Sequence, residues 1–409
     1  MIRRRHVYHL AGYDPIDPVS QHRRFVRQLA ILKRTWNVDA VASALERDDA
    51  RAWWRVSARG ANWHVEAVHE LLHWEDIIRA DLAGPLSARL VNAVRAYTDF
   101  IATGTMVRYI KANQRYAGFF LFPLVQLALF AAVAWFVAHL ALGWLGLTGI
   151  GAGAAGSVIA LGVFVALLHW PGRRWGVQHA LDDWIFSWQV IHGRRPDVGA
   201  RIDRFAQALV ARSREAGLDE IILVGHSMGA SLVLDVVARA LARDPQLGRH
   251  GPEICVLTVG STIPKFALHP AGARFRDCAA RIAEEPSIAW VEYQVRSDAI
   301  SFYKFDPLAL RRVDGDQFDK KPVIRRVQLH QMLERKSRLR LRHRVMRVHY
   351  QVVMANEQRA TYDYLLMVCS PARFTRWTMS FEGLLDFIAA DGSYREIRRC
   401  TPAAAEHAP

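Results

Sequence analysis

The segment from Tyr116 to Gly172 contains no Asp, Glu, Lys or Arg. Within it, residues from about 119 to 140 and from about 150 to 170 are each long enough to cross roughly 30 Å of hydrocarbon as an α-helix. A charge-free run of this length exceeds an ordinary core helix, so it favours a transmembrane helical hairpin over a buried helix pair or a lid. The second span begins with glycines that would let two helices approach closely: Gly151, Gly153 and Gly156.

Basic residues flank the predicted hairpin on both sides. Arg108, Lys111 and Arg115 precede it, and Arg173 and Arg174 follow it. Because the cytoplasmic ends of membrane spans carry an excess of Lys and Arg, both flanks are expected in the cytoplasm. The sequence therefore predicts an integral protein of the plasma or inner membrane, with two transmembrane helices and the rest of the chain cytoplasmic.

The formal net charge of the chain is +15, which favours anionic partners. Basic residues crowd the segment 325–347, which we call the basic segment: Arg325, Arg326, Arg335, Lys336, Arg338, Arg340, Arg342, Arg344 and Arg347. A membrane segment in the same chain makes the anionic cytoplasmic leaflet the simplest partner. We expect the basic segment to contact lipid headgroups, and no nucleic acid to bind.

Apolar strands alternate with amphipathic helices outside the hairpin. The expected strands are 6–10, 53–56, 63–68, 184–188, 220–224, 254–259 and 288–295, and the expected helices are 19–34, 74–83, 85–110, 197–214, 229–242 and 273–284. This alternation predicts an α/β fold with a mostly parallel sheet and helices on both faces. The hairpin, residues 116–172, then interrupts one domain formed by 1–115 and 173–400, and 401–409 forms a disordered tail.

The pentapeptide Gly225-His226-Ser227-Met228-Gly229 stands between an apolar strand and a helix. This is the strand–turn–helix context that a nucleophile elbow requires, and side chains at either glycine would meet neighbouring backbone. Ser227 would then be exposed above the sheet at the positive end of a helix, as a nucleophile. The N–H of Met228 would be placed to stabilise an oxyanion.

The sequence Val224–Ala230 after an apolar strand resembles the lipases and esterases of the α/β-hydrolase superfamily. Leu10–Tyr13 lies where that family places its oxyanion loop, with Ala11 in place of the usual His. The resemblance implies the Tyr13 N–H as a second oxyanion donor. Residues 256–261 resemble the strand that follows the nucleophile helix in lipases. The family resemblance implies a hydrolase-type fold and a serine hydrolase that needs no cofactor or metal.

A serine nucleophile needs an imidazole to take its proton and a carboxylate to orient that imidazole. In this family the chain order is serine, acid, histidine. Asp298 follows the strand that ends at Val295, where the family places its acid, and Asp306 is the second candidate.

Three histidines after Asp298 could serve as the base: His330, His343 and His349. His343 lies among arginines, which would make its imidazole a poor proton acceptor. Spacing favours His349 over His330.

The segment His69-Glu70-Leu71-Leu72-His73 matches the zinc-protease pattern His-Glu-x-x-His. That chemistry requires a helix, so that both histidines face one metal. The preceding residues 63–68 alternate like a strand, and no third ligand follows at the expected spacing. The four cysteines also form no CxxC pair. A zinc metalloprotease is therefore the less favoured alternative.

Together these features predict a hydrolase that cleaves an ester or thioester through an acyl-Ser227 intermediate at the cytoplasmic membrane face. The location of the site suggests an apolar acyl or lipid substrate. A non-catalytic membrane protein of the same fold, which binds a lipid or a partner, is the alternative from another class. Acyl transfer to an acceptor other than water would use the same residues.

Overall fold

The computed structural model describes residues 1–48 and 51–396. The chain forms two compact units. One, which we call the sheet unit, consists of residues 1–78, 196–268 and 272–409, and the other, the helical unit, consists of 79–195 and 269–271. The helical unit therefore extends well beyond the expected hairpin on both sides. The predicted tail 401–409 lies outside the described residues.

The sheet unit contains a nine-stranded sheet in the order β11-β8-β7-β6-β1-β5-β4-β2, with β3 paired to β4. The strands of this unit are β1 Arg4–Leu10, β2 Asp39–Ala42, β3 Glu46–Arg47, β4 Ala52–Gly60, β5 Trp63–Leu71, β6 Glu220–His226, β7 Glu253–Val259, β8 Ile288–Val295, β9 Phe305–Asp306, β10 Arg311–Arg312 and β11 Val323–Val327. From β11 to β5 all neighbours are parallel, whereas β4 pairs antiparallel with β5, β2 and β3. The α/β class and the mostly parallel sheet are as predicted.

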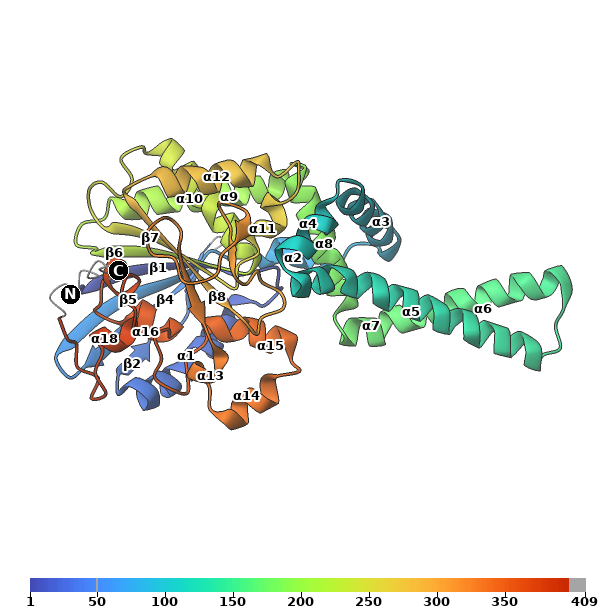
Figure 1. Ribbon diagram of the computed structural model, residues 1–409, viewed down its shortest axis with the longest axis horizontal. Coiled ribbons are helices and arrows are strands. Elements are labelled where there is room, and N and C mark those ends of the chain that lie inside the picture. Colours follow the sequence, from blue (N-terminus) through green and yellow to red (C-terminus); the bar gives the residue numbers. More distant parts are fainter. Residues whose placement is uncertain (49–50, 397–409) are drawn as a thin grey trace, which may run out of the picture. The chain divides into compact units, whose positions relative to one another are not determined.

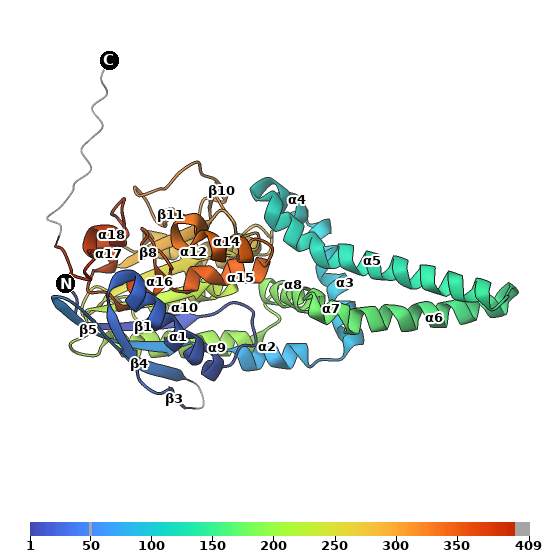
Figure 2. The ribbon, with the colours of Figure 1, turned by 90° about the horizontal axis from the view of Figure 1, so that it is seen from below.

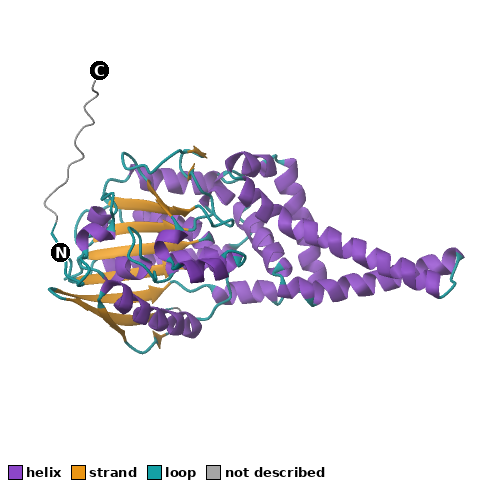
Figure 3. Cartoon of the chain, turned by 60° about the horizontal axis from the view of Figure 1, so that its bottom comes forward, coloured by secondary structure: helices purple, strands orange, loops and turns teal. Residues whose placement is uncertain are grey.

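Helices cover both faces of this sheet (Figures 1 and 3). The helices of the unit are α1 Pro18–Trp36, α9 Pro196–Ser213, α10 Met228–Arg243, α11 Ile263–Ala267, α12 Ala273–Glu284, α13 Leu329–Met332, α14 Arg335–Leu341, α15 Val345–Tyr350, η1 Gln351–Val353, α16 Tyr364–Cys369, α17 Phe374–Trp377 and α18 Leu384–Phe387. One face carries α9, α10 and α12, and the other carries α1 and α16 (Figure 1).

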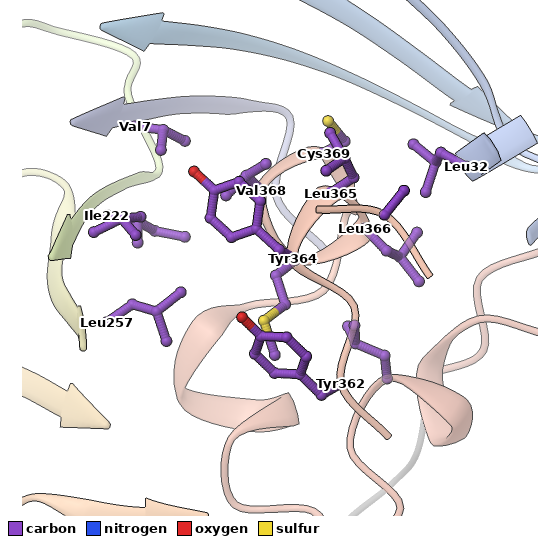
Figure 4. Close-up of a cluster of buried hydrophobic side chains, with 14 of the residues drawn as sticks. Val7, Leu32, Ile222, Leu257, Tyr362, Tyr364, Leu365, Leu366, Val368 and Cys369 are labelled. Atoms are coloured by element: carbon purple, nitrogen blue, oxygen red, sulfur yellow. The ribbon is translucent and has the colours of Figure 1, made fainter. Parts of the chain in front are cut away.

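The central strands are apolar along their whole length because both of their faces are covered. Every residue of β6 is buried. On the α1 side, Val7 of β1 and Ile222 of β6 pack with Leu32 of α1 and Leu366 of α16 in one core (Figure 4). Burial of an aliphatic side chain of this size stabilises the fold by roughly 1.5–3 kcal/mol. This core holds the carboxyl ends of β1, β6 and β7 in place.

The helical unit consists of α3 Leu86–Ala102, α4 Thr105–Ala112, α5 Gln114–Trp144, α6 Gly149–His169, α7 Pro171–Arg174 and α8 Val177–Ile191, and α2 Glu75–Leu82 leads into it. The predicted helix 85–110 is broken at Gly104, whose φ of 71° interrupts the helical hydrogen bonds. Aromatic rings form its core around Trp184, among them Phe100 and Phe120, with ring centroids 5.4 and 4.8 Å from that of Trp184.

The expected strand 184–188 is wrong, because these residues belong to α8. Trp, Ile and Phe favour strands only where a sheet is available to receive them. Here Trp184 and Trp188 lie one turn apart on a helix, and most of α8 is buried. A helix that is apolar around most of its circumference is stabilised by burial on several sides, which overrides local strand preference.

Helices α5 and α6 are long and apolar enough to cross a membrane, with 31 and 21 residues. They lie side by side as a hairpin (Figure 2). Large apolar side chains on both are exposed, including Trp135 and Ile150. Of the three glycines expected at the helix contact only Gly156 is there, since a Cβ on it would lie 2.7 Å from Leu142 Cδ1. Gly151 and Gly153 face open space.

Candidate active site

Ser227 stands at the sharp turn between β6 and α10, with φ 57° and ψ −124°. Only glycine adopts this region readily, and a side chain there costs of order 1–3 kcal/mol. The two glycines of the pentapeptide make the turn possible. A Cβ on Gly225 would lie 2.6 Å from Ala230 Cα, and one on Gly229 would lie 2.0 Å from the Leu10 carbonyl oxygen. The strained serine is therefore held by close backbone packing on both sides.

Two segments at the carboxyl ends of the strands next to β6 enclose Ser227. Its N–H donates to the carbonyl oxygen of Val259, at the end of β7, at 3.1 Å. On the other side, a Cβ on Gly12 would lie 2.8 Å from Ser227 Cβ and 3.1 Å from its Oγ. Gly12 follows β1, so the loop 10–13 passes directly over the serine. The family resemblance places this loop at the site, and its close approach to Ser227 leaves no room for a side chain at Gly12.

Asp298 and His349 form a buried pair, joined at 2.7 Å from Nδ1 of the imidazole to Oδ2 of the carboxylate. Asp298 lies just after β8 and also accepts the N–H of Ile300 at 2.9 Å. Burial by itself would raise the pKa of Asp298, but the adjacent His349 and the hydrogen bonds outweigh it and lower this pKa. Since Nδ1–H donates to the carboxylate, a neutral His349 keeps its lone pair on Nε2.

His349 is held against the elbow by its neighbours. His226 Nε2 donates to the His349 carbonyl oxygen at 3.1 Å, and the two ring centroids are 4.7 Å apart. A Cβ on Gly260 would lie 3.2 Å from His349 Cε1 and 3.4 Å from Asp298 Oδ2. Gly260 directly follows Val259, the residue to which Ser227 is bonded. The structure thus brings Ser227, His349 and Asp298 together around one glycine.

The Nε2 atom of His349 is buried and has no hydrogen-bond partner among the described residues. It makes no hydrogen bond to Ser227 Oγ in this state, and catalytic hydrogen bonds are often long before substrate binds.

Met228 is the first residue of α10, so its N–H has no partner inside the helix. Tyr13 is buried and packs on Trp74, with ring centroids 6.1 Å apart, one residue beyond Gly12.

The other candidate acid and bases lie apart from this pair. His330 is exposed on α13, and His343 is exposed and accepts from its neighbour Arg342. Asp306 uses Oδ1 to accept the N–H groups of Leu308 and Ala309, each at 2.9 Å. None of the three makes a contact with Asp298 or His349 among the described hydrogen bonds.

The His69-to-His73 pattern lies on β5 and the loop after it, not on a helix. Successive residues of a strand face opposite sides. The His69 ring packs on Trp54, with centroids 4.7 Å apart, whereas Glu70 accepts from His6 at 3.1 Å. The zinc-protease alternative therefore lacks the helical geometry that it requires.

A group of possible metal ligands lies in the helical unit: Asp99, His192 and His269. Asp99 Oδ2 is 3.0 Å from His192 Nε2 and 2.9 Å from His269 Nε2. The N–H of Ala271 donates to His269 Nδ1 at 3.1 Å, so the proton of that ring is on Nε2. Burial lowers the pKa of His269, which keeps the ring neutral. The Nε2 atom of His269 then has no lone pair for a metal. The three residues are better described as a carboxylate that is hydrogen-bonded by two imidazoles.

The basic segment does not form one exposed surface, in contrast to the prediction. Arg325 is 4% exposed and donates to the carbonyl oxygens of Thr378, Ser380 and Phe381. It lies on β11, where its side chain ties the sheet to the C-terminal region. Arg326 pairs with Asp316 at 2.7 Å. Only the part from Arg335 onward remains a basic surface, since α14 buries none of its residues.

Sequence reasoning missed two contributors to this site, His226 as the hydrogen-bond partner of the His349 carbonyl and Gly260 as the packing surface of His349. It also missed the buried His9 and His69, which line a cavity together with His226. His226 stands inside the pentapeptide at a position that any residue can occupy. Gly260 follows an apolar strand, which was a usable signal for a close approach. The buried pair His9 and His69 comes from strands far from Ser227 in the chain, so spacing could not reveal it.

Comparisons of the chain with protein-family models, with curated proteins and with solved structures give no match. The fold and the geometry of the site are therefore the basis for assigning a function.

Proposed function

We propose that this protein is a serine hydrolase of the α/β-hydrolase type, which cleaves an ester or thioester with Ser227 as nucleophile. The observation that carries the proposal is the buried Asp298–His349 pair, bonded at 2.7 Å and packed against the glycine next to the residue that binds Ser227. A strained serine with φ 57° at a strand–helix turn supports it. A turn that served only the fold would be less strained with glycine at position 227.

The reaction divides into acylation and deacylation. Ser227 Oγ attacks the carbonyl carbon while His349 Nε2 takes its proton, and Asp298 stabilises the resulting imidazolium. The N–H groups of Met228 and Tyr13 are the proposed donors to the oxyanion. Collapse breaks the bond to the leaving alcohol or thiol, which takes the proton from His349. Water then attacks the acyl-serine with His349 as base, releasing the acid and restoring Ser227.

Hydrolysis of a short 4-nitrophenyl ester by the purified full-length protein in detergent tests this proposal. We expect Ser227→Ala and His349→Ala to lower kcat to background, and Asp298→Asn to lower it about 10³–10⁴-fold because the imidazole loses its orientation. Ser231→Ala is the matched control. Ser231 lies one turn into the same helix, and its buried Oγ has no hydrogen-bond partner within residues 1–48 and 51–396. Equal rates for wild type and Ser227→Ala would refute the proposal.

We further propose that α5 and α6 span the membrane, with the sheet unit in the cytoplasm. Support comes from two long apolar helices and from basic residues on both flanks. Reporter fusions at Leu145 and after residue 396 should report opposite sides of the membrane. Reports from the same side would contradict the hairpin topology. An apolar acyl or lipid substrate is the matching proposal, because the same chain carries the two apolar helices, and it depends on this topology.

The exposed part of the basic segment is the proposed contact with anionic headgroups. It comprises α14 and the turn after it, where Arg338, Arg340 and Arg342 stand beside the half-exposed Leu339. Each such cation near an anionic surface contributes roughly 1 kcal/mol. In proteoliposomes, raising the fraction of anionic lipid should raise ester hydrolysis, and replacing the three arginines by Gln should remove this dependence.

A further inference from the structure

A cavity of about 50 Å³ lies beside the elbow in the sheet unit. Three of its lining residues are sequence neighbours of the site: Ala11 precedes Gly12, His226 precedes Ser227, and Tyr350 follows His349. A buried water needs about 10–15 Å³ of such space, so this volume admits a group of a few heavy atoms. The cavity is therefore placed to receive the part of a substrate next to the reacting carbonyl.

Arg24 of α1 lines this cavity, and its side chain is half-buried. None of the hydrogen bonds or ion pairs among the described residues involves its guanidinium. It lies over the face of the Tyr350 ring, with the guanidinium carbon 5.2 Å from the ring centroid. Burial lowers the pKa of Arg24 from its ordinary value, and nearby Asp14 opposes that effect. An arginine remains protonated under these conditions.

Two fully buried arginines of the sheet unit differ from Arg24 in that hydrogen bonds satisfy their guanidinium groups. Arg5 is 1% exposed and satisfies its guanidinium with Glu220 and the carbonyl oxygens of Met367, Ser370 and Ala372. Arg325 is bonded to three carbonyl oxygens in a similar way. A fully buried cation needs such partners because it has lost its water, whereas the half-buried Arg24 stays partly hydrated. Arg24 therefore retains the donors that an anionic ligand would use.

The remaining polar groups of the cavity do not compete strongly for that role. Asp14 is its one carboxylate among the described lining residues, and it accepts from the Tyr350 hydroxyl and from the Ile16 N–H. His9, His69 and His226 are kept neutral because burial lowers their pKa values, in the latter two to about 3. The guanidinium is thus the only cation that lines the cavity in the described part of the chain.

We propose that Arg24 binds an anionic group of the substrate, a carboxylate or a phosphate, within reach of the ester that Ser227 attacks. The planar guanidinium matches either anion with paired N–H donors. This inference rests on the proposed hydrolase function and narrows its substrate class from apolar acyl compounds to anionic ones. Tyr350 stacks on Arg24 and follows the base in the chain, so binding and catalysis share one segment.

Paired substrates test the proposal on the full-length protein in detergent. The 4-nitrophenyl ester of butyric acid is neutral. The 4-nitrophenyl monoester of succinic acid has an acyl chain of the same length that ends in a carboxylate. We expect Arg24→Ala to lower kcat/KM for the anionic ester at least tenfold and to leave the neutral ester within twofold, with Arg24→Lys between. Arg27→Ala, an exposed arginine on the same helix, is the control and should change neither. A monoacylglycerol and its phosphate ester form the second pair. If Arg24→Ala lowers kcat/KM for the phosphate ester more than for the succinate ester, the anion is a phosphate; the reverse order indicates a carboxylate.

A binding measurement separates this proposal from the function on which it rests. The Ser227→Ala variant keeps the cavity, so its affinity for the intact anionic ester should fall about tenfold when Arg24→Ala is added. If wild type hydrolyses the neutral ester through Ser227 but Arg24→Ala affects both esters equally, only the Arg24 proposal is overturned. If the anionic ester binds equally well to Ser227→Ala and to the double variant with Arg24→Ala, the Arg24 proposal is overturned whatever the activity. Hydrolysis that does not depend on Ser227 overturns the function instead.

Discussion

His226 donates a hydrogen bond from Nε2 to the carbonyl oxygen of His349 at 3.1 Å. The residue before the proposed nucleophile thus holds the backbone of the residue that is the proposed base. Together with the packing of the two imidazole rings, this hydrogen bond joins the end of β6 to α15, which are more than a hundred residues apart in the chain. The backbone of His349 is therefore tied directly to the residue before Ser227.

We expect His226→Ala to lower kcat about tenfold with little change in KM. Loss of one hydrogen bond of about 0.5–1.5 kcal/mol would loosen His349 without removing it. Since burial lowers the pKa of His226 to about 3, the ring is neutral at working pH, and the pH profile should keep its shape. His22→Ala is the control, because His22 makes a similar hydrogen bond to the Ser43 carbonyl oxygen at 2.9 Å and does not itself line the cavity beside the elbow. A changed pH profile would point to a proton-transfer role for His226.

Gly260→Ala should abolish most activity while the protein still folds. Gly260 has φ 54°, where a side chain is strained by roughly 1–2 kcal/mol, and its new methyl group would press on His349 Cε1. A displacement of about 1 Å at a catalytic group can reduce the rate about 10²-fold. Gly193→Ala separates the two effects, because Gly193 has φ 69° but open space around it. Both variants should lose thermal stability, and only Gly260→Ala should lose kcat. Full activity in Gly260→Ala would contradict the geometry of the site.

Glu292 gives a dependence of stability on pH. This buried β8 carboxyl accepts from Thr258 at 3.1 Å and from Gln294 at 2.9 Å, and burial raises its pKa to about 7. An unfolded Glu titrates near 4.3, so the folded protein holds the extra proton between about pH 4 and 7. The stabilisation by that proton is complete below this window and is lost as the pH rises through 7.

Glu292→Gln should therefore gain stability relative to wild type as the pH rises from 5 to 8. The shift in its thermal midpoint against wild type, measured at both values, checks this. The exposed Glu382→Gln should show the same difference from wild type at both pH values. A Glu292→Gln difference that stays constant, or that falls with rising pH, would show that the folded pKa of Glu292 is not raised.

The sequence predicted the local parts of this molecule well, and its distant contacts poorly. The elbow could be recognised because strand, turn and helix are adjacent in the chain. As expected, a Cβ at Gly225 or Gly229 would lie too close to neighbouring backbone. Two long apolar helices could be predicted because each apolar run is continuous in the sequence. The choice of His349 over His330 depends on spacing alone, and the structure distinguishes the two by the hydrogen bond from His349 to Asp298 and by the exposure of His330.

The errors have a common physical cause. Residues 184–188 were expected as a strand and form part of α8, because burial among other helices overrides the preferences of Trp and Ile. Arg325 was expected on a surface and is buried, because carbonyl oxygens from residues 378–381 satisfy it. Arg24 carries no signal in the sequence for the role proposed for it. In each case the partner lies in a distant part of the chain, which periodicity cannot report.

The most direct test of the central claim is covalent labelling of the full-length protein with a fluorophosphonate, followed by identification of the modified residue by mass spectrometry. The probe phosphonylates an activated serine and releases fluoride. The structure predicts one adduct, on Ser227, that is lost in Ser227→Ala, strongly reduced in His349→Ala and retained in Ser231→Ala. Labelling of wild type and Ser227→Ala to the same extent, or an adduct on another residue, would contradict the assignment of Ser227 as the nucleophile.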